Sequence, residues 1–488
     1  MVPVLLIGIP LLAGLIGFSL KDAAAKRWSL FASLLTLAVT AFGIFLPRNS
    51  PQLSFNQPWM GSLNSHFAIG LDGTGQILCL LTALAFPIIF ISTWKQEYKH
   101  AKNFYSLMLL SLTGLLGVFL ASDALLFYFF WELALIPVYF LASQWGGEKR
   151  IAASFKFFIY TFLGSLMMLI AIIYIYFHTP GHSFALQAFY QAHLQIPIEK
   201  QTWLFWFMFI AFAVKMPIFP FHTWQPDTYE QSPTAVTMVL SGLMVKMGVF
   251  GVLRWLAPVL PMGTYIWGDT VSALCVIGMI YASLIALRQD DLKRMVAYSS
   301  IAHLGLMCLA IFATTAVGLQ GVMIQMFSHG INIIGLWIIV FIIERQFGTR
   351  KISELGGIAG KAPVLTTMMM IIVLANISLP LTNGFIGEFL MFSGVYSSVA
   401  TQYNIVFTVI AAITIILSAI YMLNMVQRVF YGNTNARTEN TVDIGLNEKM
   451  VLGFIVLIIL VIGVYPEPLF RLTHDAVGSI LSKMYVKP

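Results

Sequence analysis

The sequence predicts an all-α polytopic membrane protein with about 14 transmembrane helices, two inverted five-helix repeats and broken helices 7 and 12. Composition is the first reason: 59% of the 488 residues are hydrophobic and 10% are charged, whereas a soluble domain carries roughly 25% charged residues. The second is that the chain divides into apolar segments of about the length that a bilayer requires. The third is that Lys and Arg alternate between the two sides of that division.

About fourteen segments satisfy the bilayer length of about 20 residues. The first one is followed by Lys21, Lys26 and Arg27 and preceded by no charged residue. This order is the reverse of a cleavable signal peptide, so we expect the first segment to remain as a span. The predicted spans lie near residues 2–20, 28–46, 74–94, 104–121, 124–143, 154–177, 203–220, 233–256, 266–287, 295–316, 321–343, 363–398, 404–427 and 449–466.

Alternate loops differ sharply in basic charge, as expected where cytoplasmic loops collect Lys and Arg. Nineteen of the 27 basic residues fall in the loops of one side and six in the loops of the other. This alternation predicts that both termini lie on the outer side of the membrane. Two lysines belong to neither set, because they lie inside the predicted spans.

Four ionisable side chains lie deep within predicted spans five, seven, eight and twelve: Glu132, Lys215, Lys246 and Glu388. A charge at that depth is costly and is a functional candidate by default; the alternative is a structural ion pair within the bundle. Desolvation favours the neutral form of such a group, and a nearby opposite charge favours its charged form. We therefore predict a proton relay in which Glu132 holds or releases the proton of Lys215, Lys246 receives it and Glu388 passes it on.

Helix-breaking residues stand beside two of these groups. The run KMPIFP begins at Lys215, and the run PLTNGFIGE ends at Glu388. Broken helices beside ionisable groups, in matching places of two halves, indicate an ion site in a transporter built from repeats. The two runs are five spans apart, and an odd number of spans inverts topology. We expect four regions: helices 1–3 in 1–103, a first half-channel in 104–258, a second in 259–431, and helix 14 with a C-terminal segment in 432–488.

Two histidines, His303 and His329, lie on neighbouring spans ten and eleven and titrate near neutral pH with little tuning. We expect them to connect the half-channels, with Ser299, Ser300, Ser328 and Asn332 holding water between them. Two alternatives are a bis-His haem site and a plain hydrogen-bonded role in the core. A haem is less favoured, because no second histidine pair supports an electron path.

The acidic run at Asp227 and Glu230 interrupts the otherwise basic inner side. It predicts a site of proton uptake or a contact with a partner, and the alternative is a solvated loop.

Other chemistry is missing from the sequence: Cys79, Cys275 and Cys308 stand singly, and no nucleotide-binding, metal-binding or Ser/His/Asp pattern occurs. We expect no cofactor in this chain. The basic residues are dispersed, so we expect no nucleic-acid partner.

Four long sequence segments resemble those of a known protein family. They are FYFFWELALIPVYFL, AFAVKMPIFPFHTWQPDTYEQSPTAVTMVLSGLMVKMGVFGVLR, DLKRMVAYSSIAHLG and LPLTNGFIGEF. They resemble the antiporter-like membrane subunits of respiratory complex I and cover most of spans four to thirteen. The M-type (chain 4) branch is favoured, because Glu388 stands where the L and N branches and the Mrp antiporter typically have Lys. In addition, only about 22 residues follow residue 466, whereas an L-type chain continues into a long lateral helix.

The resemblance implies roles for the matching residues. Glu132 would pair with Lys215, Lys246 would be the central lysine, and Glu388 would exchange protons with the outer side, with His303 and His329 on the connecting axis. NADH, FMN, iron–sulfur clusters and quinone would act in other subunits. The implied partners are other complex I membrane subunits, above all the antiporter-like ones, together with the lipid bilayer and protons. QPDTYEQSPT departs from the commoner LPDAHxxAPT, which puts in doubt any role carried by that histidine, here Tyr229.

Two other functions remain open at this point. An Mrp-type monovalent cation/proton antiporter subunit would have the same fold and similar lysines, although Glu388 argues against it. An anchor or quinone-site subunit of a hydrogenase-type membrane complex would not need the buried lysines for coupling. We favour a bacterial plasma membrane over a mitochondrial inner or thylakoid membrane.

Overall fold

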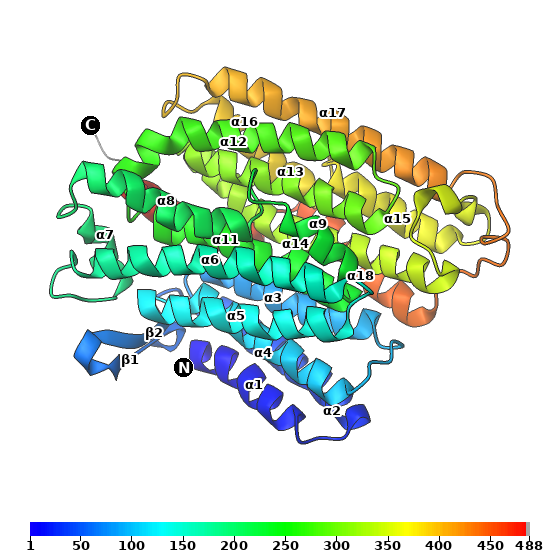
Figure 1. Ribbon diagram of the computed structural model, residues 1–488, viewed down its shortest axis with the longest axis horizontal. Helices are drawn as coiled ribbons and strands as arrows, with labels where there is room; N and C mark the ends of the chain where they lie inside the picture. Colours follow the sequence, from blue (N-terminus) through cyan, green and yellow to red (C-terminus); the bar gives the residue numbers. More distant parts are fainter. Residues whose placement is uncertain (485–488) are drawn as a thin grey trace.

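The computed structural model describes residues 1–484, and long helices lying side by side dominate it (Figure 1). The predicted helical fold class is confirmed. The first half of the chain forms α1 Val2–Gly17, α2 Asp22–Phe45, α3 Gly73–Ser92, α4 Ala101–Leu120, α5 Ala124–Trp145, α6 Arg150–Tyr176, α7 Leu186–Ala192, α8 Ile198–Lys215, α9 Trp224–Gln231, α10 Thr234–Val239 and α11 Val245–Gly251. The second half forms α12 Pro261–Leu287, α13 Leu292–Phe312, α14 Ala316–Phe347, α15 Pro363–Asn376, α16 Asn383–Tyr396, α17 Asn404–Val429, α18 Leu446–Val464 and α19 Glu467–Met484.

Eleven helices in residues 1–484 are long and apolar enough to cross a membrane, with 234–256 taken as one helix. Each of the other three predicted spans overlaps helix as well. The first is the 16-residue α1, and the seventh and twelfth are the broken pairs α8–α9 and α15–α16. The count of fourteen spans therefore stays a prediction, while the membrane class is confirmed.

Both predicted helix breaks are present. Helix α8 ends at Lys215 and α9 begins at Trp224, so the two prolines of KMPIFP lie in the gap, where a missing N–H costs no helical hydrogen bond. Helix α15 ends at Asn376 and α16 begins at Asn383. Residues 378 and 381 in that second gap have φ of 57° and 73°, a left-handed backbone that ends regular helix.

A third irregularity was not predicted. The helix that carries Lys246 is wound in wider π-type turns at Leu240–Met244 and Val252–Leu256, on either side of α11. Such turns are frequent at functional sites, because they free backbone groups and shift the facing of side chains. They have no signature in a pattern of apolar residues, so the sequence predicts this span as an ordinary helix.

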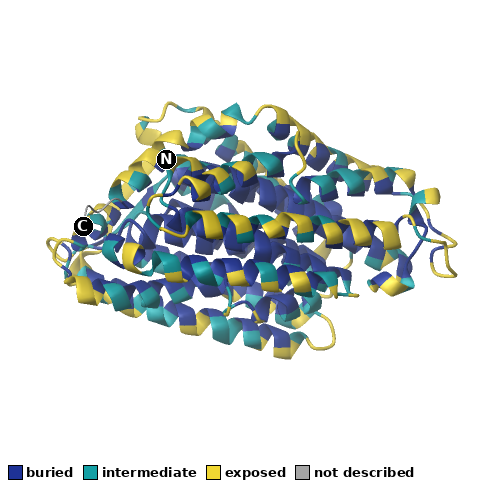
Figure 2. Cartoon of the chain, turned by 90° about the horizontal axis from the view of Figure 1, so that it is seen from above, coloured by how far each residue is buried: buried dark blue, intermediate teal, exposed yellow. Residues whose placement is uncertain are grey.

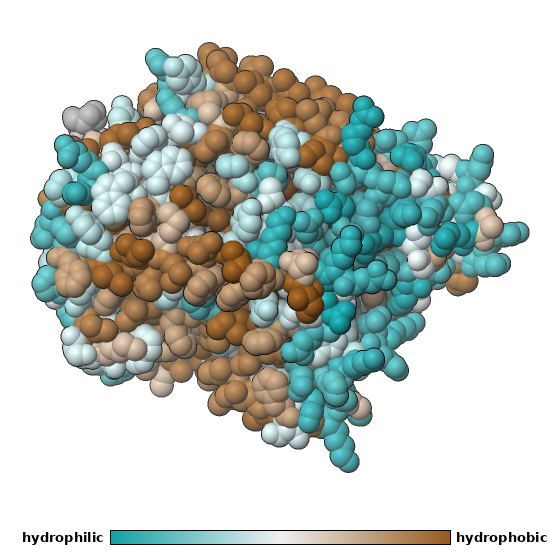
Figure 3. Space-filling view, viewed as in Figure 1, coloured by the Kyte–Doolittle hydropathy of each residue, from teal (hydrophilic) through white to brown (hydrophobic). Residues whose placement is uncertain are grey.

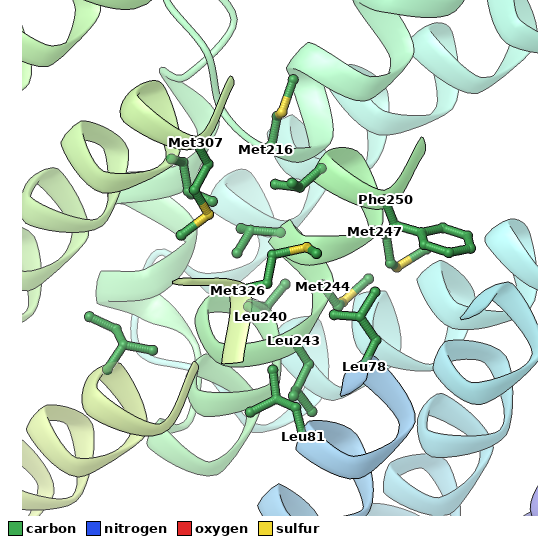
Figure 4. Close-up of a cluster of buried hydrophobic side chains, with 14 of the residues drawn as sticks. Leu78, Leu81, Met216, Leu240, Leu243, Met244, Met247, Phe250, Met307 and Met326 are labelled. Carbon is green, nitrogen blue, oxygen red and sulfur yellow. The ribbon is translucent and has the colours of Figure 1, made fainter. Parts of the chain in front are cut away.

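The core lies at the centre of the bundle, where Figure 2 shows buried residues filling the middle and exposed ones along the margin. Helix α14, with 32 residues, crosses this centre and is buried along its apolar length. Leu81, Leu243, Met244, Met247 and Met326 form part of a hydrophobic cluster there (Figure 4). Flexible methionine side chains fill the gaps around the irregular turns on either side of α11, so the helix that carries Lys246 is packed in an apolar core.

Three local structures differ from the sequence expectations. Residues 54–70 form an antiparallel hairpin of β1 Ser54–Met60 and β2 Ser65–Gly70 within an otherwise all-α chain. The acidic run expected as a loop is helix α9. The C-terminal segment forms α19, whose Asp475 makes an ion pair with Arg48 in the connection between α2 and the hairpin.

The hydrophilic surface is concentrated at the ends of the bundle. Figure 3 shows a hydrophobic belt with dense hydrophilic side chains at the end opposite the hairpin. That end carries the loops in which most of the basic residues lie, so it is the predicted inner side. The N-terminus and the hairpin lie together at the other end (Figure 1).

Candidate functional site

Lys246 and His329 form the centre of the site. The ammonium of Lys246, which is fully buried, donates to the carbonyl of Ser241 at 3.0 Å and contacts Nδ1 of His329 at 2.8 Å. The ring continues the chain, because Nε2 of His329 lies 3.2 Å from the hydroxyl of Ser300. When Lys246 is charged it donates to Nδ1, so Nε2 carries the ring proton and donates to Ser300. The wide turn at Leu240–Met244 places the Ser241 carbonyl within reach.

His303 and Glu388 continue the same line toward the second broken helix. Nδ1 of His303 lies 2.8 Å from a carboxylate oxygen of Glu388, and both side chains are 8% exposed. The rings of His303 and His329 are 5.4 Å apart between centroids. Four of the predicted site residues, one each from α11, α14, α13 and α16, therefore lie in one connected row of two hydrogen-bonded pairs, with adjacent histidine rings but no hydrogen bond between the pairs among the described residues.

This row does not suit a haem. Both ring nitrogens of His329 already face Lys246 and Ser300, and Nδ1 of His303 faces Glu388. A bis-His haem needs one free nitrogen on each ring, directed at a common iron. The geometry therefore favours a role in proton transfer for these histidines over a role as haem ligands.

Lys215 and Glu132 lie apart from each other. No ion pair joins them within 4.0 Å among the described residues, and the Lys215 ammonium, although fully buried, has no hydrogen-bond partner there. It lies over the rings of Trp131, at 5.5 Å, and Phe157, at 5.7 Å. Aromatic faces attract a cation more weakly than a carboxylate does. The expected contact between Glu132 and Lys215 is thus open in this conformation.

The two lysine-bearing helices pack closely. A Cβ added at Gly248 of α11 would stand 2.6 Å from the carbonyl oxygen of Phe212 and 2.8 Å from the amide of Met216, at the end of α8. The absence of a side chain at this position lets the two backbones approach each other. The end of α8, where Lys215 lies, is therefore held against the helix of Lys246, although no direct contact between the two ammonium groups is present among the described residues.

The acidic run on α9 joins the two halves of the chain. Asp227 pairs with Lys156 at 2.8 Å and with Arg294 at 3.1 Å. Glu230 pairs with Arg294 at 2.8 Å and with Arg350 at 2.9 Å. Burial alone would raise the pKa of the Asp227 carboxyl, but hydrogen bonds from Lys156 and Arg294 lower it below its ordinary value. The run is thus an ion-pair network and not a freely solvated loop.

A large polar cavity opens beside this network. Its volume is about 1040 Å³, and its lining includes Glu230, Ser232, Thr234 and Lys293. From its floor the hydroxyl groups of α10 continue toward Ser241, whose carbonyl accepts the hydrogen bond from Lys246. Hydroxyl groups both donate and accept hydrogen bonds, so this path is suited to water and protons.

Comparison with known proteins identifies the family of this chain. Residues 121–418 match the family described as NADH:quinone oxidoreductase/Mrp antiporter, TM. NADH-quinone oxidoreductase subunit M of Rickettsia typhi is 38% identical over 459 residues, which cover 93% of this chain and 92% of that protein. The subunit M of Rhodobacter capsulatus is 35% identical and covers 95% and 92%. The chloroplastic NAD(P)H-quinone oxidoreductase chain 4 of Mesostigma viride is 34% identical and covers 98% and 96%.

Solved structures agree as well. A chain of respiratory complex I from Thermus thermophilus with bound NADH superposes with a TM-score of 0.91 and 26% identity, over 100% of both chains. A chain of the membrane-bound sulfane sulfur reductase, an archaeal respiratory membrane complex, gives a TM-score of 0.85 at 21% identity and so supports the fold alone. The chain belongs to the family of NADH:quinone oxidoreductase and Mrp antiporter membrane subunits.

Proposed function

We propose that this chain is the antiporter-like, proton-translocating M subunit of a NADH-quinone oxidoreductase in a bacterial plasma membrane. Its full-length similarity to M subunits of Rickettsia and Rhodobacter supports this assignment. The single structural observation that carries it is the connected row of Lys246, His329, His303 and Glu388. The electron donor, FMN, iron–sulfur clusters and quinone act in other subunits, and the energy of their reaction drives this one.

The row supports one order of proton transfer. Protons from the polar inner cavity reach Lys246 along the hydroxyl groups of α10, pass through the ring of His329 and Ser300, and reach Glu388 through His303. A neutral imidazole takes a proton on one nitrogen and releases another from the opposite nitrogen, so each ring transfers a proton without moving far. Glu388 then releases the proton toward the outer side.

Lys215 and Glu132 supply the switch. When Glu132 approaches Lys215, their attraction holds the proton on Lys215. When the pair is open, as in this structure, no direct ion pair holds the charge, and two aromatic rings and the more distant Glu132 carboxylate are left to stabilise it. Lys215 then tends to lose its proton to the inner path or toward Lys246. Motion of Glu132, driven by neighbouring subunits, therefore sets the direction of transfer.

The two broken helices suit this alternation. We assign spans four to eight, in 104–258, and nine to thirteen, in 259–431, as two inverted half-channels, with 1–103 and 432–488 as the regions before and after them. Backbone groups freed at the breaks of α8–α9 and α15–α16 can be satisfied by water beside Lys215 and Glu388. Neighbouring antiporter-like subunits of the same complex are the expected partners.

The test is Lys215→Met in the intact complex within membrane vesicles, with NADH-driven acidification and quinone reduction measured together. The variant keeps side-chain length while removing the charge, so we expect proton translocation to be lost. Lys200→Met, on the exposed outer end of the same α8, is the matched control and should translocate normally. Normal pumping by Lys215→Met would refute the switch. Pumping that depends on sodium would instead favour the cation/proton antiporter function, and coupling that survives loss of both lysines would favour an anchor or quinone-site subunit.

A further inference from the structure

Glu388 borders a small cavity that the relay described above does not use. The cavity has a volume of about 10 Å³ and is enclosed by α12, α13, α16 and α17. Four apolar residues, from α12, α13 and α17, form part of its wall: Met279, Ala302, Leu306 and Ile415. The polar part consists of His303, Glu388, Thr414, Ser418 and Tyr421. A volume of this size holds about one water molecule, provided that two to four polar groups surround it.

Three of the polar residues lie on one face of α17. Thr414, Ser418 and Tyr421 follow one another at intervals of four and three residues, the spacing that stacks side chains along a helix. All three are at most 7% exposed, whereas much of the rest of α17 is exposed and apolar, as a lipid-facing helix is (Figure 2). A buried hydroxyl face on such a helix is costly unless it binds something polar.

The three hydroxyl groups differ in what they can offer. Thr414 donates to the carbonyl of Ala411 at 2.6 Å, and Ser418 donates to the carbonyl of Ile415 at 2.8 Å. Each of these groups has used its only proton and can still accept a hydrogen bond. The hydroxyl of Tyr421 makes no hydrogen bond of normal length within residues 1–484, although the residue is 2% exposed and Ser299 and Glu388 lie close enough to affect it electrostatically. Tyr421 is therefore the hydrogen-bond donor that remains free at the cavity.

Glu388 supplies the matching acceptor. One carboxylate oxygen contacts Nδ1 of His303 at 2.8 Å, which leaves the second oxygen for the cavity. A water molecule there can accept from Tyr421, donate to Glu388 and donate to Ser418 or Thr414. This arrangement satisfies the phenol and the carboxylate together, as buried polar groups require.

We propose that Tyr421 is a positioning residue that holds Glu388, through one bound water molecule, in the orientation from which it exchanges its proton. The proposal rests on the proposed function, because it needs Glu388 to carry the proton. In this proposal α17 shields the site from lipid and also helps to hold the water molecule that orients Glu388. Tyr421 itself neither gains nor loses a proton in this role.

The test compares Tyr421→Phe with wild type in the assembled complex, because this change removes one hydroxyl and keeps the ring. Loss of the hydrogen bond from the phenol to the water, a bond between two neutral groups, predicts translocation slower by about two- to tenfold. Infrared difference spectra should show a shifted carboxyl stretch for the acid that Glu388→Gln removes. Tyr105→Phe is the matched control, because Tyr105 of α4 is also buried with an unbonded hydroxyl but lies away from the cavity.

Each outcome of this test either supports or overturns the proposal. Slower translocation with a shifted carboxyl band in Tyr421→Phe, and neither change in Tyr105→Phe, supports the proposal. An unshifted band, or equal slowing in both variants, overturns it. If Tyr421→Phe fails to assemble, Thr414→Val, which removes an acceptor at nearly constant volume, must shift the band; no shift overturns the proposal. Full translocation by Glu388→Gln overturns the proposed function and this inference with it, whereas loss in Glu388→Gln with no effect of Tyr421→Phe overturns only the inference.

Discussion

Replacement of His329 by Leu tests the connected row at its most constrained point. His329 separates two contacts, 2.8 Å to Lys246 and 3.2 Å to Ser300, on opposite edges of its ring. Leucine fills similar space but offers neither a donor nor an acceptor, and no single hydrogen bond reaches from Lys246 to Ser300 across the width of the lost ring. The row is then interrupted between the two halves.

The size of the effect follows from the surroundings of Lys246. Its ammonium has three donors, and two of them are used, by Ser241 and His329. A hydrogen bond to a charged group contributes about 1.5–3 kcal/mol. At about 1.4 kcal/mol per factor of ten, its loss lowers the ratio of charged to neutral Lys246 by roughly 10- to 150-fold. Translocation limited by this step should slow by a similar factor.

The assay is the initial rate of NADH-driven acidification of membrane vesicles, normalised to the amount of assembled complex. His329→Gln retains a donor and an acceptor and should fall between wild type and His329→Leu. His474→Leu, at a side chain 84% exposed on α19, controls for the loss of a histidine. Wild-type translocation by an assembled His329→Leu complex would refute the connected row as the proton path.

Two further predictions concern stability. The pKa of Asp227 is lowered in the folded protein, so its ion pairs stabilise the fold fully above the ordinary carboxyl pKa of about 4. This stabilisation is lost as pH falls through the lowered value. Asp227→Asn should therefore lower the melting temperature of the purified complex at pH 7, and the difference from wild type should shrink below about pH 4. Gly248→Ala should overpack α11 against the α8 backbone at 2.6 Å and cost about 1–3 kcal/mol, measured as a lower melting temperature. Gly453→Ala on α18, where a Cβ meets nothing within 4 Å, should leave stability unchanged or higher.

The site residues were predictable because charge inside a membrane is scarce. Lys246 and Glu388 stand out in apolar runs whatever the tertiary structure, and the Pro and Gly runs beside Lys215 and Glu388 indicate the broken helices directly. Their contacts were not predictable in the same way. His303 and Glu388 are 85 residues apart, and only the packing of α13 against α16 brings them together.

Other features left a weak signal in the sequence or none. The wide turns around α11 arise from packing, because the apolar pattern of that span fits an ordinary helix equally well. Tyr421 was missed because one tyrosine in a chain with 18 of them carries little information; the Thr, Ser and Tyr spacing on a lipid-facing helix is the pattern that could have singled it out. The sequence of α9 resembles that of a polar loop, because the basic residues that pair with its carboxylates lie far away in the sequence.

The two buried lysines have opposite surroundings, and under the proposed function this difference gives them different tasks. Lys246 is fixed by a carbonyl and an imidazole, so its position changes little when its proton leaves. Lys215 has two aromatic faces and no hydrogen bond among the described residues, so its charged form depends on the approach of Glu132. A fixed group transmits protons, and a group with a movable counter-ion controls when they enter. Under the proposed function, the row that begins at Lys246 in the first half-channel and continues through His329 into the second is the conducting path. Conformational energy from the neighbouring subunits then enters at Glu132 and Lys215.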